Sequence, residues 1–250
     1  MNNKGTKLLK EGDVLPYKYG KFQVIEYQGC KKVKVRFLDE FSHQRFVAAG
    51  DAVLGKISNP FARSCCGLGY IGVGEYRPKT HKYEYTLWTS MFSRCYNTNE
   101  RSLSYQNKEV KEVWYNFQNF AEWCQQQVGF KQPKWQLDKD ILVKGNTFYG
   151  PDTCCFVPQR VNLLLVKADA KRGEYPLGVC KSGKWFHVNC GSKEDGSNSY
   201  VGIYDNLEDA VNAYKTRKEE IIKTVANIYK DLLDIRVYEA LMLYEVSVSD

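Results

Sequence analysis

The stretch from residue 175 to residue 222, YPLGVCKSGKWFHVNCGSKEDGSNSYVGIYDNLEDAVNAYKTRKEEII, decides the expected fold of the C-terminal part of the chain. Glycines separate three short β-prone runs, at residues 178–181, 185–190 and 199–204. A helical run follows, with Asp205 or Asn206 as its N-cap and Glu208 and Asp209 in its first turn. The order of these segments predicts a three-stranded sheet covered by one helix.

The second run alternates in a way that gives the sheet two different faces. Successive side chains of a strand point to opposite sides, which groups Phe186, Val188 and Cys190 against Trp185, His187 and Asn189. The first group can pack on the helix, while the second offers a ring and hydrogen-bonding groups. A sheet of this kind can enter a DNA groove while nearby cations hold the phosphates. We therefore expect these DNA-binding residues: Lys181, Lys184, Trp185, His187 and Asn189.

The pattern GV…GKW…GIYDNLEDAVNAY resembles the ethylene-response-factor type of DNA-binding domain, which also occurs in phage homing endonucleases. The resemblance rests on the following positions: Gly178, Val179, Gly183, Trp185, Gly202, Tyr204, Ala210, Ala213 and Tyr214. It implies a sheet that reads the major groove of double-stranded DNA and a helix that backs the sheet. The strands carry fewer arginines than the plant pattern, so the resemblance does not identify the bases read. A sheet and helix without a ligand is the alternative.

The middle third of the chain carries the candidate chemistry. Two aromatic-rich runs at helical spacing, residues 85–97 and 113–128, predict a packed pair of helices. The segments LDKDIL (137–142), VKGNTFYGPDT (143–153), CCFVP (154–158) and QRVNLLL (159–165) then predict a strand, a glycine-containing loop, a second strand and a helix. Cys154 and Cys155 fall where the second strand should be buried.

This order is similar to the ββα-metal core of HNH endonucleases, and residues 85–166 resemble phage-encoded proteins grouped with HNH homing nucleases. The resemblance implies a divalent ion, Mg²⁺ or Mn²⁺, held by Asp138 and Asn162 against the scissile phosphate. The general base, a histidine in the family, falls at Lys139. The asparagine that orients this histidine falls at Thr153 when residues 151–153 are aligned with the second strand.

Lys139 is a poor general base, because an unperturbed lysine has a pKa of about 10.4 and nearby carboxylates favour its charged form. We expect Lys139 to bind a phosphate or to stabilise developing charge. Asp140 is a candidate second metal ligand or alternative base, since strand alternation puts Asp138 and Asp140 on one face. The alternative is a solvated strand end in which the carboxylates pair with Lys139 or Lys144.

The sequence of the N-terminal third predicts a small β-barrel over residues 1–62. Its β-prone runs cover residues 21–27, 32–38 and 45–49. Lys32, Lys34 and Arg36 give one strand a basic face, which a solvated edge explains better than a phosphate contact. We interpret residues 63–84, with the glycine-rich run GLGYIG (67–72), as a linker. A domain with an HNH-like core would follow at 85–172 and the DNA-binding module at 173–250, which gives an α+β protein.

Beyond residue 222 the helical spacing continues without proline or glycine, which predicts one or two long helices that dock on their own domain. Homodimerisation through the terminal helix is the functional alternative. The net charge of +7 suits a polyanionic partner. Nine cysteines without a C-x-x-C pair, and no apolar stretch of membrane-spanning length, indicate reduced thiols in the cytoplasm of a bacterial host and no membrane partner.

Two functions from different classes follow from these features. The first is a metal-dependent DNA endonuclease of the phage homing type with a weakened active site, in which the C-terminal module finds the target. The second is a catalytically inactive DNA- or protein-binding factor that uses the nuclease scaffold for regulation or counter-defence, with a host protein as a further partner.

Overall fold

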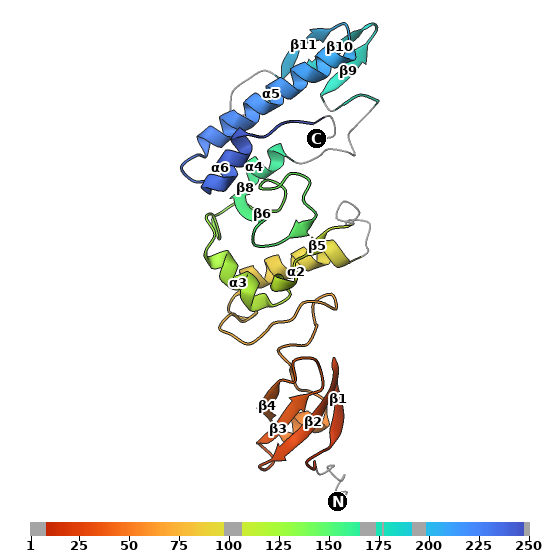
Figure 1. Ribbon diagram of the computed structural model, residues 1–250, viewed down its shortest axis with the longest axis vertical. Coiled ribbons are helices and arrows are strands. Elements are labelled where there is room, and N and C mark those ends of the chain that lie inside the picture. Colours follow the sequence, from red (N-terminus) through yellow and green to blue (C-terminus); the bar gives the residue numbers. More distant parts are fainter. Residues whose placement is uncertain (1–8, 98–106, 166–173, 177, 192–198, 248–250) are drawn as a thin grey trace, which may run out of the picture. The chain divides into compact units, whose positions relative to one another are not determined.

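The computed structural model describes residues 9–97, 107–165, 174–176, 178–191 and 199–247. It is a mixed α+β structure with several small sheets (Figure 1). The chain divides into two compact units, residues 1–122 and 123–250. This division differs from the sequence-based boundaries at residues 62, 84 and 172.

The first unit begins with an antiparallel sheet of four strands in the order β1-β2-β3-β4. Their bounds are Val14–Tyr17 (β1), Gly20–Tyr27 (β2), Val33–Phe37 (β3) and Gln44–Val47 (β4). In the part of the chain that the structure describes, no pairing joins β1 to β4, so the expected closed barrel is an open meander. A short helix on one face of the sheet completes its core without barrel closure.

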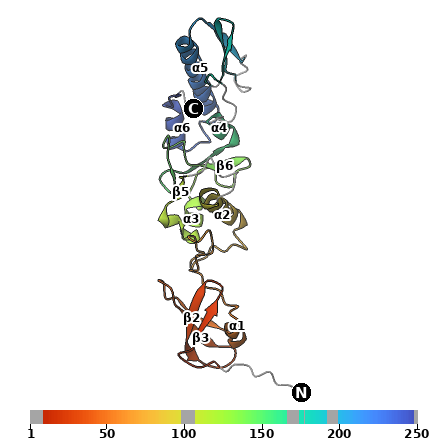
Figure 2. The same cartoon turned by 90° about the vertical axis from the view of Figure 1, so that its right-hand side faces the viewer.

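That helix is α1, Ala49–Val53, which lies beside the sheet (Figure 2). Its Ala52 is fully buried with the inward side chains of the sheet. These inward residues are Leu15, Phe22, Val24, Val33, Val35 and Phe37. The alternation expected in the third of these runs is confirmed, because Val33, Val35 and Phe37 are buried while Lys34 and Arg36 remain partly exposed.

The segment expected to be a linker packs within the first unit. A Cβ atom on Gly69 would lie 2.6 Å from the Trp88 ring, which explains why a glycine stands there. The Arg63 guanidinium donates to the Leu68 carbonyl at 2.9 Å. It also lies 5.2 Å from the centroid of the Tyr70 ring. These contacts anchor residues 63–70 within the first unit.

The aromatic-rich runs form helices α2, Lys82–Tyr96, and α3, Phe117–Gln125. A 3₁₀ turn, η2 (Glu112–Trp114), precedes α3, so the second helix begins later than the expected residue 113. The short strand β5, Glu109–Val110, comes before this turn. The indole nitrogen of the buried Trp88 donates to the Trp114 carbonyl at 2.7 Å, which ties α2 to the turn.

The second unit begins with a strand pair followed by a helix, in the expected order. Strand β6, Trp135–Asp138, pairs antiparallel with β8, Cys155–Pro158, and helix α4, Gln159–Leu164, follows directly. The connecting loop contains the two-residue strand β7, Phe148–Tyr149. Cys154 and Cys155 are buried, as the sequence predicts.

The C-terminal module is a three-stranded antiparallel sheet in the order β11-β10-β9. Its strands are Val179–Ser182 (β9), Trp185–Asn189 (β10) and Tyr200–Tyr204 (β11). Helix α5, Leu207–Ile228, packs on this sheet (Figure 1). The side chain of Asn206 accepts from the Asp209 backbone amide at 2.8 Å, so Asn206 is the N-cap. The predicted sheet and helix are therefore confirmed.

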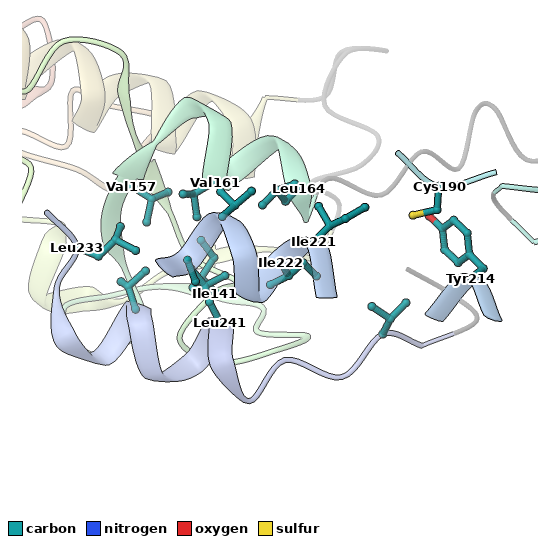
Figure 3. Packing of buried hydrophobic residues seen from close by; sticks show 14 of the residues in the cluster. Ile141, Val157, Val161, Leu164, Cys190, Tyr214, Ile221, Ile222, Leu233 and Leu241 are labelled. Atoms are coloured by element: carbon teal, nitrogen blue, oxygen red, sulfur yellow. The ribbon is translucent and has the colours of Figure 1, made fainter. Parts of the chain in front are cut away.

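One hydrophobic cluster joins the β6–β8 hairpin, α4 and the C-terminal module (Figure 3). The chain after α5 turns at residues 229–234 and forms a second helix, α6, Ile235–Met242. Val237 and Leu241 of α6 are fully buried in this cluster, so the terminal helix docks on its own unit. The β6–β8 hairpin and α4, which were expected in a domain over residues 85–172, consequently share a core with the module expected at 173–250. None of the helices in the described ranges is long and apolar enough to span a membrane.

Candidate nucleic-acid interface

The face of the β9–β11 sheet that points away from α5 carries the side chains expected to read DNA. Trp185 is 42% exposed and Asn189 is also exposed, whereas Phe186 and Val188 of the same strand are buried. His187 is half-buried between its register partners, Cys180 and Ile203. The structure therefore brings Trp185, His187 and Asn189 together on one open surface.

Strand β11 adds two large side chains to this open face that the sequence reasoning missed. Tyr200 pairs with Asn189, after a register shift, and Ile203 pairs with His187. Directly opposed residues lie on the same side of an antiparallel pair. Tyr200 and Ile203 are each about half exposed. The β-prone run at residues 199–204 was recognised, but its register against its neighbour was needed to place these side chains.

The two lysines expected beside this face lie on different sides of the sheet. Lys184 stands in the turn before β10, and its Nζ lies 4.7 Å from the centroid of the exposed Trp185 ring. Lys181 is the register partner of the buried Phe186, and its Nζ lies 5.4 Å from the Phe186 ring. The structure thus places Lys184 at the open face and Lys181 toward the side of the sheet that α5 covers.

At the end of β6, Asp138 shapes the turn that follows. One carboxylate oxygen, Oδ1, accepts from the backbone amides of Asp140 at 2.8 Å and Ile141 at 2.9 Å. Burial raises the pKa of the Asp138 carboxyl above its usual range, and these two hydrogen bonds act in the opposite direction. Because β6 ends at Asp138, the strand alternation that would put Asp138 and Asp140 on one face does not apply. Asp140 is exposed in the bend.

Lys139 points into the loop rather than toward solvent. Its side chain is 5% exposed, and its ammonium donates to Asp140 Oδ1 at 2.6 Å and to the Asn146 carbonyl at 3.1 Å. The side chain of Asn146 donates to the Lys139 carbonyl at 2.8 Å and accepts from the Phe148 amide at 3.1 Å. Lys139 and Asn146 therefore hold the loop between β6 and β8 together.

Asn146 was not singled out by the sequence reasoning. Its position after Gly145, in a loop between two strands, is typical of an asparagine that hydrogen-bonds to nearby backbone. This pattern could have marked Asn146 as a structural residue, but it does not show that Asn146 pairs with Lys139.

The structure brings Asn162 to the same hairpin. Its side-chain nitrogen donates to Gln136 Oε1 at 2.7 Å. Gln136 and Asp138 are two residues apart in β6 and share one side of the strand. Thr153 lies in the turn before β8, outside the strand to which it was aligned. Its hydroxyl donates to the Phe148 carbonyl at 3.0 Å, which gives it a local structural role.

Metal-ligating side chains are sparse at this hairpin. Among the residues described, no group of three or more His, Cys, Asp or Glu side chains is placed to hold one ion. Asp138 Oδ1 bonds to two amides, whereas Asn162 bonds to Gln136 through nitrogen and retains its amide oxygen. Mg²⁺ and Mn²⁺ take carboxylate and amide oxygens as ligands. Asp138 and Asn162 have the right chemistry for two ligands of such an ion, which is fewer than a complete site requires.

Comparisons with known proteins add no constraint on this interface. No family model, curated protein or solved structure matches the chain.

Proposed function

We propose that this protein binds double-stranded DNA through the open face of the β9–β11 sheet. The observation that carries the proposal is the exposed Trp185 ring with the Lys184 ammonium against it, on a sheet whose opposite face is covered by α5. Trp185 is not a member of the hydrophobic cluster of its unit, whereas a ring and a cation at one strand end can contact a base edge and a phosphate.

The other side chains of this face have suitable chemistry for groove recognition. Asn189 carries an amide, the group that bonds in bidentate fashion to adenine in the major groove. Ile203 offers an apolar contact of the kind made with a thymine methyl group. The net charge of +7 favours association with a polyanion over the whole surface.

The proposal is tested by duplex binding of the purified full-length chain, measured by fluorescence anisotropy over a series of salt concentrations. We expect an affinity that falls linearly with salt on a log–log plot, with a slope of about −0.9 for each phosphate neutralised. Trp185→Ala and Asn189→Ala should change the preference between duplex sequences. Tyr19→Ala, which removes an exposed ring in the first unit, is the matched control and should change nothing. If the wild-type chain raised the anisotropy of no duplex, the result would contradict the proposal.

A metal-dependent cleavage of the bound DNA is the second candidate. The hydrogen bond between Asn162 and Gln136 favours it, because this bond sets the amide on the side of β6 that also carries Asp138. Asp138 and Asn162 would hold the ion, which when bound would activate water and stabilise the charge on the leaving oxygen. Lys139 does not fit the role of base, because its ammonium is buried and donates to Asp140 and Asn146.

These contacts make a DNA-binding factor without cleavage the better-supported function, one that acts by occupying its site for regulation or counter-defence. Plasmid nicking in Mg²⁺ or Mn²⁺, against EDTA and against Asp138→Ala, separates the two candidates. Salt-sensitive binding without metal-dependent nicking supports the binding factor. Nicking that requires both the ion and Asp138 would establish a nuclease instead.

A further inference from the structure

The N-terminal sheet has a second surface whose features its own fold does not require. On the outer side of β3, Lys34 and Arg36 alternate with the buried residues of the core. Across the strand pair, Lys34 is opposite Phe46 of β4, and Arg36 is opposite Gln44. Lys32 precedes the strand on the same side. We call Lys32, Lys34, Arg36 and Phe46 the Phe46 face.

Phe46 is exposed although the sheet has a well-formed core on its other side. Its ring is 43% exposed, whereas Phe22 and Phe37 of the same sheet are completely buried. Burial of an aromatic side chain stabilises a fold, and this sheet does not gain that stabilisation from Phe46. The ring therefore calls for an explanation other than core packing.

Two ammonium groups lie over or beside this ring. Lys32 Nζ is 4.9 Å from the centroid of the Phe46 ring, and Lys34 Nζ is 5.9 Å from it. Both distances lie within the range of cation–π attraction, about 6 Å. The ring and the cations thus form one group across β3 and the edge strand β4.

The charge of the Phe46 face is largely unbalanced. Within the described residues, none of its three basic side chains has a carboxylate within ion-pair distance. Glu26 is the register partner of Lys34, but its carboxylate accepts a hydrogen bond from Gln28. The surface therefore presents three cations against one carboxylate.

Protection of an edge strand from unwanted pairing explains neither the basic residues, which lie on and just before the interior strand β3, nor the exposed phenylalanine on the edge strand β4. An aromatic platform flanked by cations suits a strand of nucleic acid whose bases are unpaired, since every base has a face that can stack on the ring. A duplex suits it less well, because its bases are already stacked on one another.

We propose that the Phe46 face binds single-stranded nucleic acid. One unpaired base stacks on Phe46, and Lys32, Lys34 and Arg36 hold the adjoining phosphates. This site is separate in the chain from the β9–β11 sheet, and it does not depend on that sheet binding a duplex.

The experiment uses the full-length chain and fluorescein-labelled oligodeoxythymidylate, with anisotropy as the readout. Phe46→Ala should weaken binding on the order of tenfold, as expected for the loss of one stacked base. A double variant, Lys32→Ala with Lys34→Ala, should reduce the salt slope by about 1.4, since each phosphate contact on a single strand contributes about 0.7. Tyr19→Ala is the matched control, because it removes an equally exposed ring with a single lysine, Lys18, beside it.

Four outcomes would overturn the proposal. They are the absence of oligonucleotide binding by the wild-type chain, unchanged affinity in Phe46→Ala, an equal loss in Tyr19→Ala, and displacement of the oligonucleotide by polyglutamate as readily as by unlabelled strand. The last outcome would mean that the Phe46 face binds any polyanion, with or without bases. Trp185→Ala, assayed on duplex DNA alongside, reports on the β9–β11 sheet alone, so either site can fail without the other.

Discussion

The ammonium nitrogen of Lys139 lies 2.6 Å from a carboxylate oxygen of Asp140, its next neighbour in the chain, although the lysine side chain is buried and the aspartate is exposed. The same ammonium donates to the Asn146 carbonyl at 3.1 Å. Through these two hydrogen bonds the Lys139 ammonium holds the loop that leads to β8. It is therefore not available to bind a phosphate or to accept a proton.

The substitution Lys139→Met should destabilise the protein while leaving DNA affinity unchanged. It keeps most of the side-chain volume but removes the donor to the buried Asn146 carbonyl. Loss of a buried hydrogen bond from a charged group costs about 1.5–3 kcal/mol, which urea unfolding followed by circular dichroism would measure. Asp140→Asn is the control. Asp140 is the exposed member of the ion pair with Lys139, so loss of its charge should cost less than about 1 kcal/mol. A Met variant as stable as the wild type but defective in DNA binding would contradict this structural role.

The stability of the protein should depend on pH through Asp234, and its partner Arg236 fixes the sign of this dependence. Its hydrogen bond with the Arg236 side chain holds the pKa of the Asp234 carboxyl below its usual range. A carboxyl with a lowered pKa stabilises the fold above the pKa of the unfolded state, about 3.9, and this contribution is lost as the pH falls through the folded-state value. Asp234→Asn keeps an N-cap oxygen for α6 but loses the charge.

The expected difference in unfolding free energy between wild type and Asp234→Asn is less than about 1 kcal/mol at pH 7, because the pair lies near the surface. It should shrink toward zero below about pH 4. Urea unfolding at a series of pH values from 3 to 7 would measure it, and a difference that grew on acidification would show that the sign is wrong.

Most of the correct sequence predictions came from local periodicity. The alternation around Trp185 and Phe186 predicted β10 and its two faces. The polar residues before a helical run predicted Asp205 or Asn206 as the cap, and the structure selects Asn206. Both signals involve neighbours within a few residues. The order of strand, loop, strand and helix around Asp138 was readable for the same reason.

The incorrect predictions involve long-range pairing or unusual burial. Closure of a barrel depends on contacts between β1 and β4, which no local pattern reports, and β1 itself was missed because Pro16 interrupts its β-prone character. Burial of Lys139 could not be expected, since a lysine is almost never buried unless it is paired. Its anchor, Asn146, lies seven residues away in a loop without periodicity.

The vicinal thiols of Cys154 and Cys155, at the start of β8, should be inert in the native protein. Burial raises the pKa of the Cys154 thiol to about 12 and raises that of Cys155 as well, so neither forms the reactive thiolate at neutral pH. Iodoacetamide at pH 7.5, followed by peptide mass spectrometry, should modify Cys30, Cys66 and Cys180, which are exposed. Cys154 and Cys155 should react only after denaturation. Rapid native labelling of Cys155 would show that β8 opens under these conditions.

Lys184 and Lys181 form a matched pair for testing which side of the C-terminal sheet meets DNA. They are three residues apart on either side of one turn, and both are exposed, but only Lys184 lies against the open-face Trp185 ring. Lys184→Ala should weaken binding to all duplex sequences alike and reduce the salt slope by about 0.9, the contribution of one phosphate. Lys181→Ala should leave the affinity and the slope nearly unchanged, because a phosphate bound at the open face is remote from the side of the sheet that α5 covers. Equal effects of the two substitutions would mean that bulk charge dominates binding. A larger effect of Lys181 would place the DNA at the β9 edge, on the helix side of the sheet, and the proposed reading face would then be wrong.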